Sequence, residues 1–283
     1  MTLTGLSRPA ELRLKAMPST EWNPTAYLTF ASERTQPFID LLSRVRTPGV
    51  RSIVDLGCGP GNGMPVVRAM WPQAHVTGVD SSAEMIARAR EATADDPYVT
   101  YHQADVRSLS PADLPEGRAA DLVVSNAALQ WLPDHRELLP QLMDLVAPGG
   151  AFAVQVPGNF GAPSHRLLGE LVEQEPYAAH LDPEVLLRPT AGIQDYMHDV
   201  ARPGWEVEAW ETTYQHILQG DDPVFEWISA AAARPVLQSL PDREREQFAL
   251  QYKSALREAY PRTGLGTVLP FRRIFFIARR PAA

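Results

Sequence analysis

Residues 53–62, IVDLGCGPGN, combine a carboxylate with three glycines at alternate positions. The apolar pair before Asp55 predicts a buried strand, and Gly57, Gly59 and Gly61 let the main chain turn sharply with no Cβ in the way. A large ligand can therefore lie against bare backbone at the carboxyl end of a strand, which is where open α/β sheets bind ligands. The alternative for any such loop is a glycine-rich turn that only connects a strand to a helix.

A second carboxylate, Asp80, ends the next expected strand, residues 74–79. An acid at this position can accept hydrogen bonds from both hydroxyls of a ribose, as in dinucleotide-binding folds. The loop reads G-x-G-x-G, however, whereas the dinucleotide fingerprint is G-x-G-x-x-G and holds a pyrophosphate at a helix amino terminus. Asp55 would repel a pyrophosphate and would suit an ammonium group. A ligand with a ribose, an ammonium and no phosphate is S-adenosylmethionine.

Further motifs follow in order, and residues 51–156 resemble the class I methyltransferases that use S-adenosylmethionine. The matching segments are DSSAEM at 80–85, QAD at 103–105, DLVVSNAALQW at 121–131 and LVAPGGAFAV at 145–154. The resemblance implies an α/β fold, a Rossmann-like sheet of seven strands whose last pair is antiparallel, with a helical cap insertion. It implies S-adenosyl-L-methionine as cofactor, S-adenosyl-L-homocysteine as product and no metal. The cofactor-binding residues that it implies are Asp55, Gly57, Gly59, Gly61, Asn62, Asp80, Ser81, Met85, Ala104, Asp105, Asn126 and Ala127.

Several of these residues also have a purely structural interpretation. Asp105 could cap a turn, and Met85 shares an apolar face with Ile86, so that core packing competes with adenine contact. Asp121 begins a strand and is expected to anchor the sheet. Cys58, the single cysteine, is expected to pack rather than react, and one cysteine excludes an internal disulfide framework.

The composition is typical of a cytoplasmic enzyme that acts on a small molecule. The chain has 283 residues, 45% of them hydrophobic, which suffices for a full core. A formal net charge of −8 argues against a nucleic-acid partner, because phosphate binding needs a basic surface. No apolar run reaches the length of a membrane span, and the amino-terminal residues lack the continuous apolar core of a secretory signal. Oligomeric state is left open.

The alternation of strand and helix patterns predicts right-handed crossovers and a parallel sheet. We expect a disordered extension over residues 1–21 and a cofactor-binding core over 22–158. A cap segment over 159–204 and a final region over 205–283 should follow. Aromatic and polar residues alternate in 205–218 and again in 266–279, which predicts strands six and seven. Between them, residues 219–263 look helical and exceed a hairpin loop, so we expect a cap insertion there.

From Trp22 onward nearly the whole chain is similar to the trans-aconitate 2-methyltransferase family. The segments that carry this likeness are WNPTAYLTFASER at 22–34, LQWLPDH at 129–135, QVPGN at 155–159, TTYQH at 212–216, WI at 227–228, RP at 234–235 and PFRRIFFIARR at 270–280. The stretch before Trp22 and the connection around 176–187 depart from the family pattern.

A polycarboxylate acceptor is already ionised at neutral pH, so methyl ester formation requires no general base. We therefore predict no catalytic residue, only proximity and orientation of the two reactants. The spectator carboxylates call for arginines, whose planar fork meets a carboxylate bidentately. We expect the substrate-binding residues to be Trp22, Tyr27, Trp131, Tyr214, His216, Arg234 and Arg272.

The choice between Arg272 and Arg273 is open, since adjacent strand residues point to opposite faces. Tyr214 and His216 could simply form the polar side of a strand. We expect His135 to belong to a helix start and His165, at another helix start, not to reach the substrate.

Two other functions stay open. One is methylation of a different small acceptor such as a hydroxyl, although that chemistry usually requires a base with a tuned pKa and none stands out. The other is a non-catalytic module that binds S-adenosylmethionine. The intact set of glycines and acids argues against it.

Overall fold

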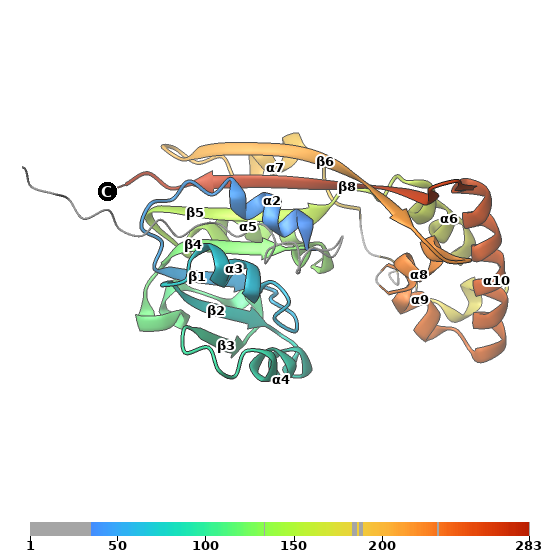
Figure 1. Cartoon of the computed structure of the whole chain (residues 1–283), viewed down its shortest axis with the longest axis horizontal. Helices are drawn as coiled ribbons and strands as arrows, with labels where there is room; N and C mark the ends of the chain where they lie inside the picture. Colours follow the sequence, from blue (N-terminus) through green and yellow to red (C-terminus); the bar gives the residue numbers. More distant parts are fainter. Residues whose placement is uncertain (1–34, 133, 183–185, 187–188, 231, 283) are drawn as a thin grey trace, which may run out of the picture.

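The computed structural model describes residues 35–132, 134–182, 186, 189–230 and 232–282. The expected extension over 1–21 and the first part of the core, 22–34, lie outside the described residues. The chain forms one twisted sheet with helices on both faces and a separate group of helices at one end (Figure 1). No helix within the described ranges is both long enough and apolar enough to cross a membrane.

The sheet has the strand order β3-β2-β1-β4-β5-β8-β6. Its strands are β1 (Ser52–Leu56), β2 (His75–Asp80), β3 (Val99–Gln103), β4 (Ala120–Asn126), β5 (Val146–Pro157), β6 (Glu206–Leu218) and β8 (Gly266–Arg279). The pairs among β1 to β5 are parallel, as the alternating pattern predicted. Because chain order reverses beside β1, the carboxyl ends of β1 and β4 flank a crevice, where such sheets bind ligands.

The antiparallel pairing predicted for the last two long strands is confirmed. β8 is antiparallel to β5 and also to β6, so β6 runs in the same direction as β5. The sheet has one strand more than the seven expected, because the two residues of β7 (Arg262–Thr263) pair with the start of β8. So short a strand carries no periodic pattern that a sequence could reveal.

Two apolar layers cover the sheet. On one face α2 (Gln36–Ser43), α3 (Met64–Met70) and α4 (Ala83–Ala92) pack on the inner strands through residues such as Phe38 and Ile86. On the other face lie α5 (His135–Met143), α7 (Ile193–Asp199) and the short turns η1 (Val106–Ser108), η2 (Pro111–Asp113), η3 (Pro115–Gly117) and η4 (Leu129–Trp131). The inner strands are therefore mostly buried, whereas the edge strands β3 and β6 are largely half-buried or exposed.

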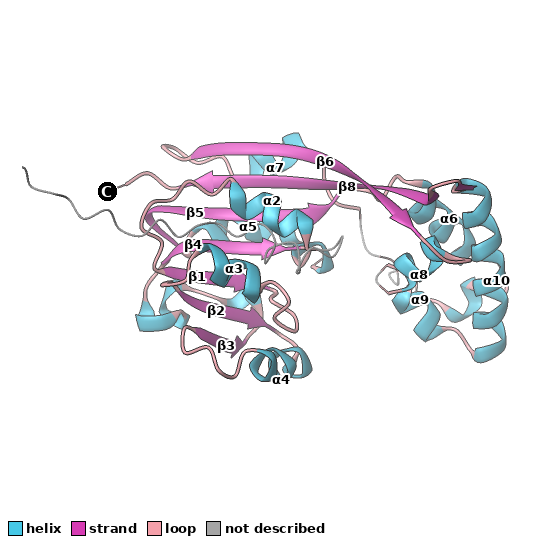
Figure 2. Cartoon of the chain, in the orientation of Figure 1, coloured by secondary structure: helices cyan, strands magenta, loops and turns pink. Residues whose placement is uncertain are grey.

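A third apolar cluster forms the cap. It joins α6 (Pro163–Val172), η5 (Ala178–His180), α8 (Pro223–Ser229), α9 (Arg234–Ser239) and α10 (Asp242–Ala259). The far ends of β6 and β8 run on into these helices, so the long ribbon carries the cap beyond the sheet (Figure 2).

The expected cap segment 159–204 is split between cap and core. Its first helix, α6, packs in the cap cluster, whereas α7 lies on the sheet with Tyr196 fully buried in the core. The reason is a polar anchor that the sequence pattern does not reveal. The Tyr196 hydroxyl lies 2.7 Å from His135 Nε2, and His135 Nδ1 lies 3.0 Å from the Leu132 carbonyl. His135 is thus structural, as predicted.

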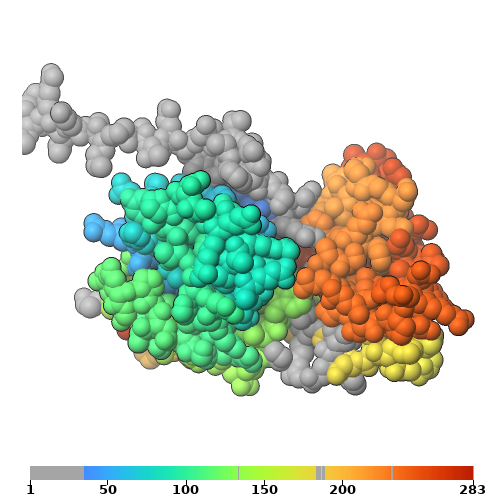
Figure 3. All heavy atoms as spheres, turned by 90° about the horizontal axis from the view of Figure 1, so that it is seen from below, coloured from blue at the N-terminus to red at the C-terminus, as the bar shows by residue number. Residues whose placement is uncertain are grey.

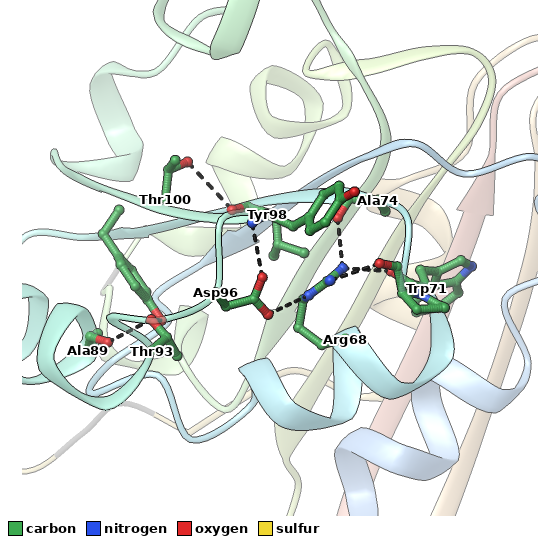
Figure 4. A network of polar contacts seen from close by, with 11 residues as sticks. Arg68, Trp71, Ala74, Ala89, Thr93, Asp96, Tyr98 and Thr100 are labelled. Carbon is green, nitrogen blue, oxygen red and sulfur yellow. Dashed lines mark hydrogen bonds and ion pairs between the residues drawn. The ribbon is translucent and has the colours of Figure 1, made fainter.

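A half-buried ion pair braces the edge of the sheet at the amino ends of β2 and β3 (Figure 4). Arg68 on α3 donates from Nε to Asp96 at 2.7 Å and from Nη1 to the carbonyls of Trp71 and Ala74, both at 3.0 Å. Its guanidinium also lies 4.8 Å from the centre of the Tyr98 ring. One side chain thereby fastens the turn before β2 to the turn before β3.

Candidate functional site

A cavity of about 670 Å³ lies where the sheet meets the cap. Figure 3 shows these two parts as separate lobes of the molecule. The cavity wall takes residues 55–63 from the core and α6, α8 and β8 from the cap side. One space therefore touches both the predicted cofactor loop and the predicted acceptor region.

The glycine loop closes one end of this cavity. Gly57 has φ +74° and Gly59 has φ +54°, both in the left-handed region that favours glycine. A Cβ on Gly57 would lie 2.3 Å from the Cβ of Ala128, so this position also needs the missing side chain. The N–H groups of Gly57 and Cys58 both donate to the Val79 carbonyl, at 2.8 and 3.0 Å, which ties the loop to β2.

Cys58 is buried, and burial together with the charges of Asp55 and Asp80 raises the pKa of its thiol. A thiol that stays protonated is a poor nucleophile. Its packing role agrees with the sequence interpretation.

The two acids of the loop region differ in their surroundings. Asp80 accepts from Gly59 N–H at 3.0 Å and from Ser82 N–H at 2.9 Å, so each carboxylate oxygen already has one donor. Asp55 is 4% exposed and lies on the cavity wall. Burial, with a smaller contribution from the Asp80 charge, raises the pKa of Asp55 to about 7. A cation bound here would restore ionisation of that carboxylate.

The end of β4 supplies a second wall. Asn126 and Ala127 both line the cavity, and Ala127 holds the rare φ of +52° while its N–H donates to the Gln155 carbonyl at 2.9 Å. The side-chain Oδ1 of Asn126 is buried and has no hydrogen-bond partner among the described residues. An acceptor left open in this way suits a ligand that donates protons.

Seven of the twelve cofactor residues implied by the resemblance line the cavity: Asp55, Gly57, Gly59, Gly61, Asn62, Asn126 and Ala127. Asp80 stands behind the loop that it holds. The other four, Ser81, Met85, Ala104 and Asp105, are not on the cavity wall.

Asp105 has the alternative role that its sequence left open. It caps η1 and forms an ion pair with Arg107 at 2.6 Å, and the Arg107 hydrogen bonds hold the pKa of Asp105 below its ordinary value. Met85 is half-buried and belongs to none of the three core clusters, so the predicted core packing is not seen either.

The predicted acceptor residues other than the two arginines divide into three groups. Trp131 lines the cavity and is 40% exposed. Tyr214 and His216 lie behind the wall: the Tyr214 hydroxyl donates to Asp40 at 2.5 Å, and His216 stacks on Trp227, with ring centres 4.7 Å apart. Trp22 and Tyr27 lie outside the described residues.

Neither arginine of the predicted clamp lies on the cavity wall. Arg234 is exposed at the start of α9 and is not on the cavity wall. Arg272 points away: its Nε donates to the Gly158 carbonyl at 2.7 Å, and its Nη1 lies 3.4 Å from Glu211. Its neighbour Arg273 is 7% exposed and lines the cavity, with its guanidinium 4.5 Å from the centre of the Phe271 ring.

Burial along β8 alternates up to Arg273 and leaves Arg272 exposed, but from Arg273 onward both faces are buried, and the apolar run of the sequence hides the alternation. Residues 273, 275 and 277 share the face of α2 because the register with β5 places them there.

Other wall residues were not among the predicted binding residues. His165, expected not to reach the substrate, lines the cavity, as does Asn159, which is 4% exposed. Gln130 lies on the wall with its Nε2 donating to the Ala127 carbonyl at 2.6 Å. Besides Trp131, the aromatic side chains of Phe38, Phe160, Trp227 and Phe271 lie on the wall. The family-like segments QVPGN and WI contained Asn159 and Trp227, but nothing in them indicated a side-chain direction.

Comparison with known proteins agrees with this geometry. Residues 53–150 match the family model described as "Methyltransferase domain". The chain is 43% identical to a trans-aconitate 2-methyltransferase of Streptomyces avermitilis, over 94% of this chain and 99% of that protein. It is 41% identical to a protein of the same name from Escherichia coli O45:K1, over 92% of this chain and 98% of that protein.

Solved structures show the same fold at low sequence identity. The YcgJ protein of Bacillus subtilis matches with a TM-score of 0.54 and 15% identity, over 89% of this chain and 99% of that one. Coclaurine N-methyltransferase bound to N-methylheliamine and S-adenosylhomocysteine matches with a TM-score of 0.53 and 15% identity, over 86% of this chain and 71% of that one.

Proposed function

The chain belongs to the trans-aconitate 2-methyltransferase family, and from that premise we propose that it transfers the methyl group of S-adenosylmethionine to a carboxylate of trans-aconitate. The observation that carries the proposal is that a single cavity is lined both by the glycine loop and by the buried guanidinium of Arg273. A methyl donor and a polyanion can therefore meet in one space.

The residues at the loop end fit the donor. Asp55 favours a cation beside it, and the open Oδ1 of Asn126 can accept from an ammonium. Each Asp80 oxygen keeps a lone pair for a ribose hydroxyl after accepting one N–H bond. S-adenosylmethionine supplies an electrophilic methyl group on a sulfonium and leaves as S-adenosylhomocysteine.

The other end fits the acceptor. Arg273 offers a fork of donors to one carboxylate, and burial excludes the water that would otherwise compete. Trp131 and Trp227 supply flat apolar walls on the way in. Trp22 and Tyr27, outside the described residues, remain proposed contacts on the amino-terminal side.

The chain then has to orient the reactants rather than move protons. A carboxylate is ionised at neutral pH and attacks without a base. Holding two reactants at near-attack distance can supply roughly 7–11 kcal/mol of the barrier. The histidine on the cavity wall agrees with this: burial lowers the pKa of His165 to about 4, which makes it a weak base.

The test is an acid panel with S-adenosylmethionine in excess, read by mass spectrometry. We expect a methyl ester of trans-aconitate, formed together with S-adenosylhomocysteine and cleaved by mild alkali. A product resistant to alkali, formed on a hydroxyl acid, would instead support the methylation of another acceptor. Donor binding in calorimetry with no methylated product from any acid would contradict the proposal and favour a non-catalytic module.

A further inference from the structure

Among the described residues, the cap contributes one imidazole to the cavity, that of His165. It lies in the first turn of α6, and that turn is held from both sides by α10. The hydroxyl of Tyr260 accepts from Ser164 N–H at 3.0 Å, and the hydroxyl of Tyr252 donates to the Ser164 carbonyl at 2.7 Å. The place of the imidazole is therefore set by the framework of the cap and not by a loose loop.

The hydrogen bonds of the ring determine which nitrogen is available to a ligand. Nδ1 lies 3.4 Å from Asn159 Nδ2 and 3.2 Å from Ser164 Oγ. With the Asn159 amide in this orientation its nitrogen donates to Nδ1, and the neutral ring then carries its proton on Nε2. Nε2 has no hydrogen-bond partner among the described residues, and the ring forms part of the wall. His165 thus presents an N–H donor to the cavity.

This donor carries no charge at neutral pH, because burial lowers the pKa of His165 to about 4. A neutral donor in a buried wall avoids the cost of an unpaired buried cation. It still forms a charge-assisted hydrogen bond when the acceptor is a carboxylate.

The wall thus holds two different groups for anions, and they come from different parts of the molecule. Arg273 lies on β8 of the sheet, and His165 belongs to the cap. We propose, building on the function proposed above, that His165 is a specificity-determining residue whose Nε2–H binds a carboxylate distinct from the one at Arg273 and from the one that is methylated. The cap then selects tricarboxylates, because His165 binds the third carboxylate.

Three dicarboxylic acids test this, because each lacks a different carboxylate of trans-aconitate: mesaconate, cis-glutaconate and itaconate. We expect His165→Leu to lower kcat/KM for trans-aconitate by roughly 10- to 100-fold, mainly through KM, as for loss of one hydrogen bond to a charged group. One of the three dicarboxylates should be unaffected by the substitution, since it lacks the carboxylate that His165 binds.

Two further variants separate the hydrogen bond from the packing. His165→Gln keeps an N–H donor at nearly the same reach and should stay within about threefold of the native protein on trans-aconitate. Asn159→Ala removes the amide that donates to His165 Nδ1. It should lower kcat/KM for the same acids as His165→Leu does, but by a smaller factor. His180→Leu, an exposed cap histidine away from the cavity, is the matched control and should change nothing.

The outcomes separate this inference from the proposed function. If the native protein esterifies none of the four acids, the proposed function is wrong, and so is the proposed role of His165. Native protein that esterifies trans-aconitate, with His165→Leu lowering all four acids equally or none of them, overturns the role of His165 alone. Calorimetry with S-adenosylmethionine should give the same Kd for every variant, and a weakened Kd would show cap damage and count against the inference.

Discussion

The two ends of the cavity are built in opposite ways. The loop end consists of nearly consecutive residues, 55–63, and presents main chain as much as side chains. The far end consists of side chains from η4, α6, α8 and β8, which lie far apart in the sequence. A site made of backbone needs a particular local conformation, whereas a site made of side chains needs particular packing.

The two ends also differ in charge. Asp55 and Asp80 make the loop end acidic, while Arg273 and His165 supply donors at the other end. The cationic methyl donor is thereby expected to bind at the loop end and the anionic methyl acceptor at the other end. Four substitutions test this difference between the two ends, and the one with the greatest predicted change in free energy comes first.

Removing the charge of Asp55 should stabilise the free protein at high pH. The folded state holds a proton on Asp55 up to about pH 7, whereas the unfolded chain releases it near 3.8. The native free energy of unfolding therefore falls as pH rises across that window, by about 4 kcal/mol from this group. Asp55→Asn should lack this loss and bind S-adenosylmethionine more weakly. Denaturant unfolding at pH 4 and pH 8 measures the free energy of unfolding of the native protein and of Asp55→Asn. An equal change of this free energy with pH in both proteins would contradict the prediction.

A methyl group on Gly57 should damage the loop end. Gly57→Ala places a Cβ 2.3 Å from Ala128 in a residue with φ +74°, and we expect a destabilisation of about 3 kcal/mol with loss of donor binding. Gly49→Ala is the matched control, since Gly49 has φ +65° but open space around it, and should cost only about 1 kcal/mol. Equal costs for the two would show that the contact with Ala128 is not limiting.

The adjacent arginines test the far end. Arg273→Ala should lower kcat/KM for trans-aconitate roughly thirtyfold, about 2 kcal/mol, and leave donor affinity unchanged. Arg272→Ala should stay within about threefold, because its partners are the Gly158 carbonyl and Glu211. Steady-state kinetics with both substrates gives the answer. A larger loss of kcat/KM for Arg272→Ala would instead support the prediction from the sequence that Arg272 binds the substrate.

The smallest effect concerns the residue behind the wall. Tyr214→Phe removes the hydroxyl that donates to Asp40 across α2 and β6, at a cost of about 1 kcal/mol in unfolding free energy. Because Tyr214 does not line the cavity, kcat and KM should be unchanged. A raised KM for the acceptor would mean that Tyr214 reaches the substrate after all.

The parts that could be predicted are those with a local cause. The βα alternation, the loop at Gly57 to Gly61 and the acidic tip at Asp80 follow from residue types in consecutive positions. The division of the cap, with α7 on the sheet, could not be predicted, because it depends on a contact between Tyr196 and His135. The histidine that lines the cavity, His165, was discounted because a helix start is an ordinary place for such a residue.

The sequence alone determined the family, the sheet and the loop that meets the donor, since each depends on backbone conformations that a few consecutive residues impose. Tertiary structure alone decided that Arg273 rather than Arg272 enters the cavity and that His165 joins it from the cap. Arg273 begins the part of β8 that is buried on both faces, where the apolar residues give neighbouring side chains no distinguishing pattern. Only the register of β8 against β5, and the docking of α6 on α10, assign them a direction.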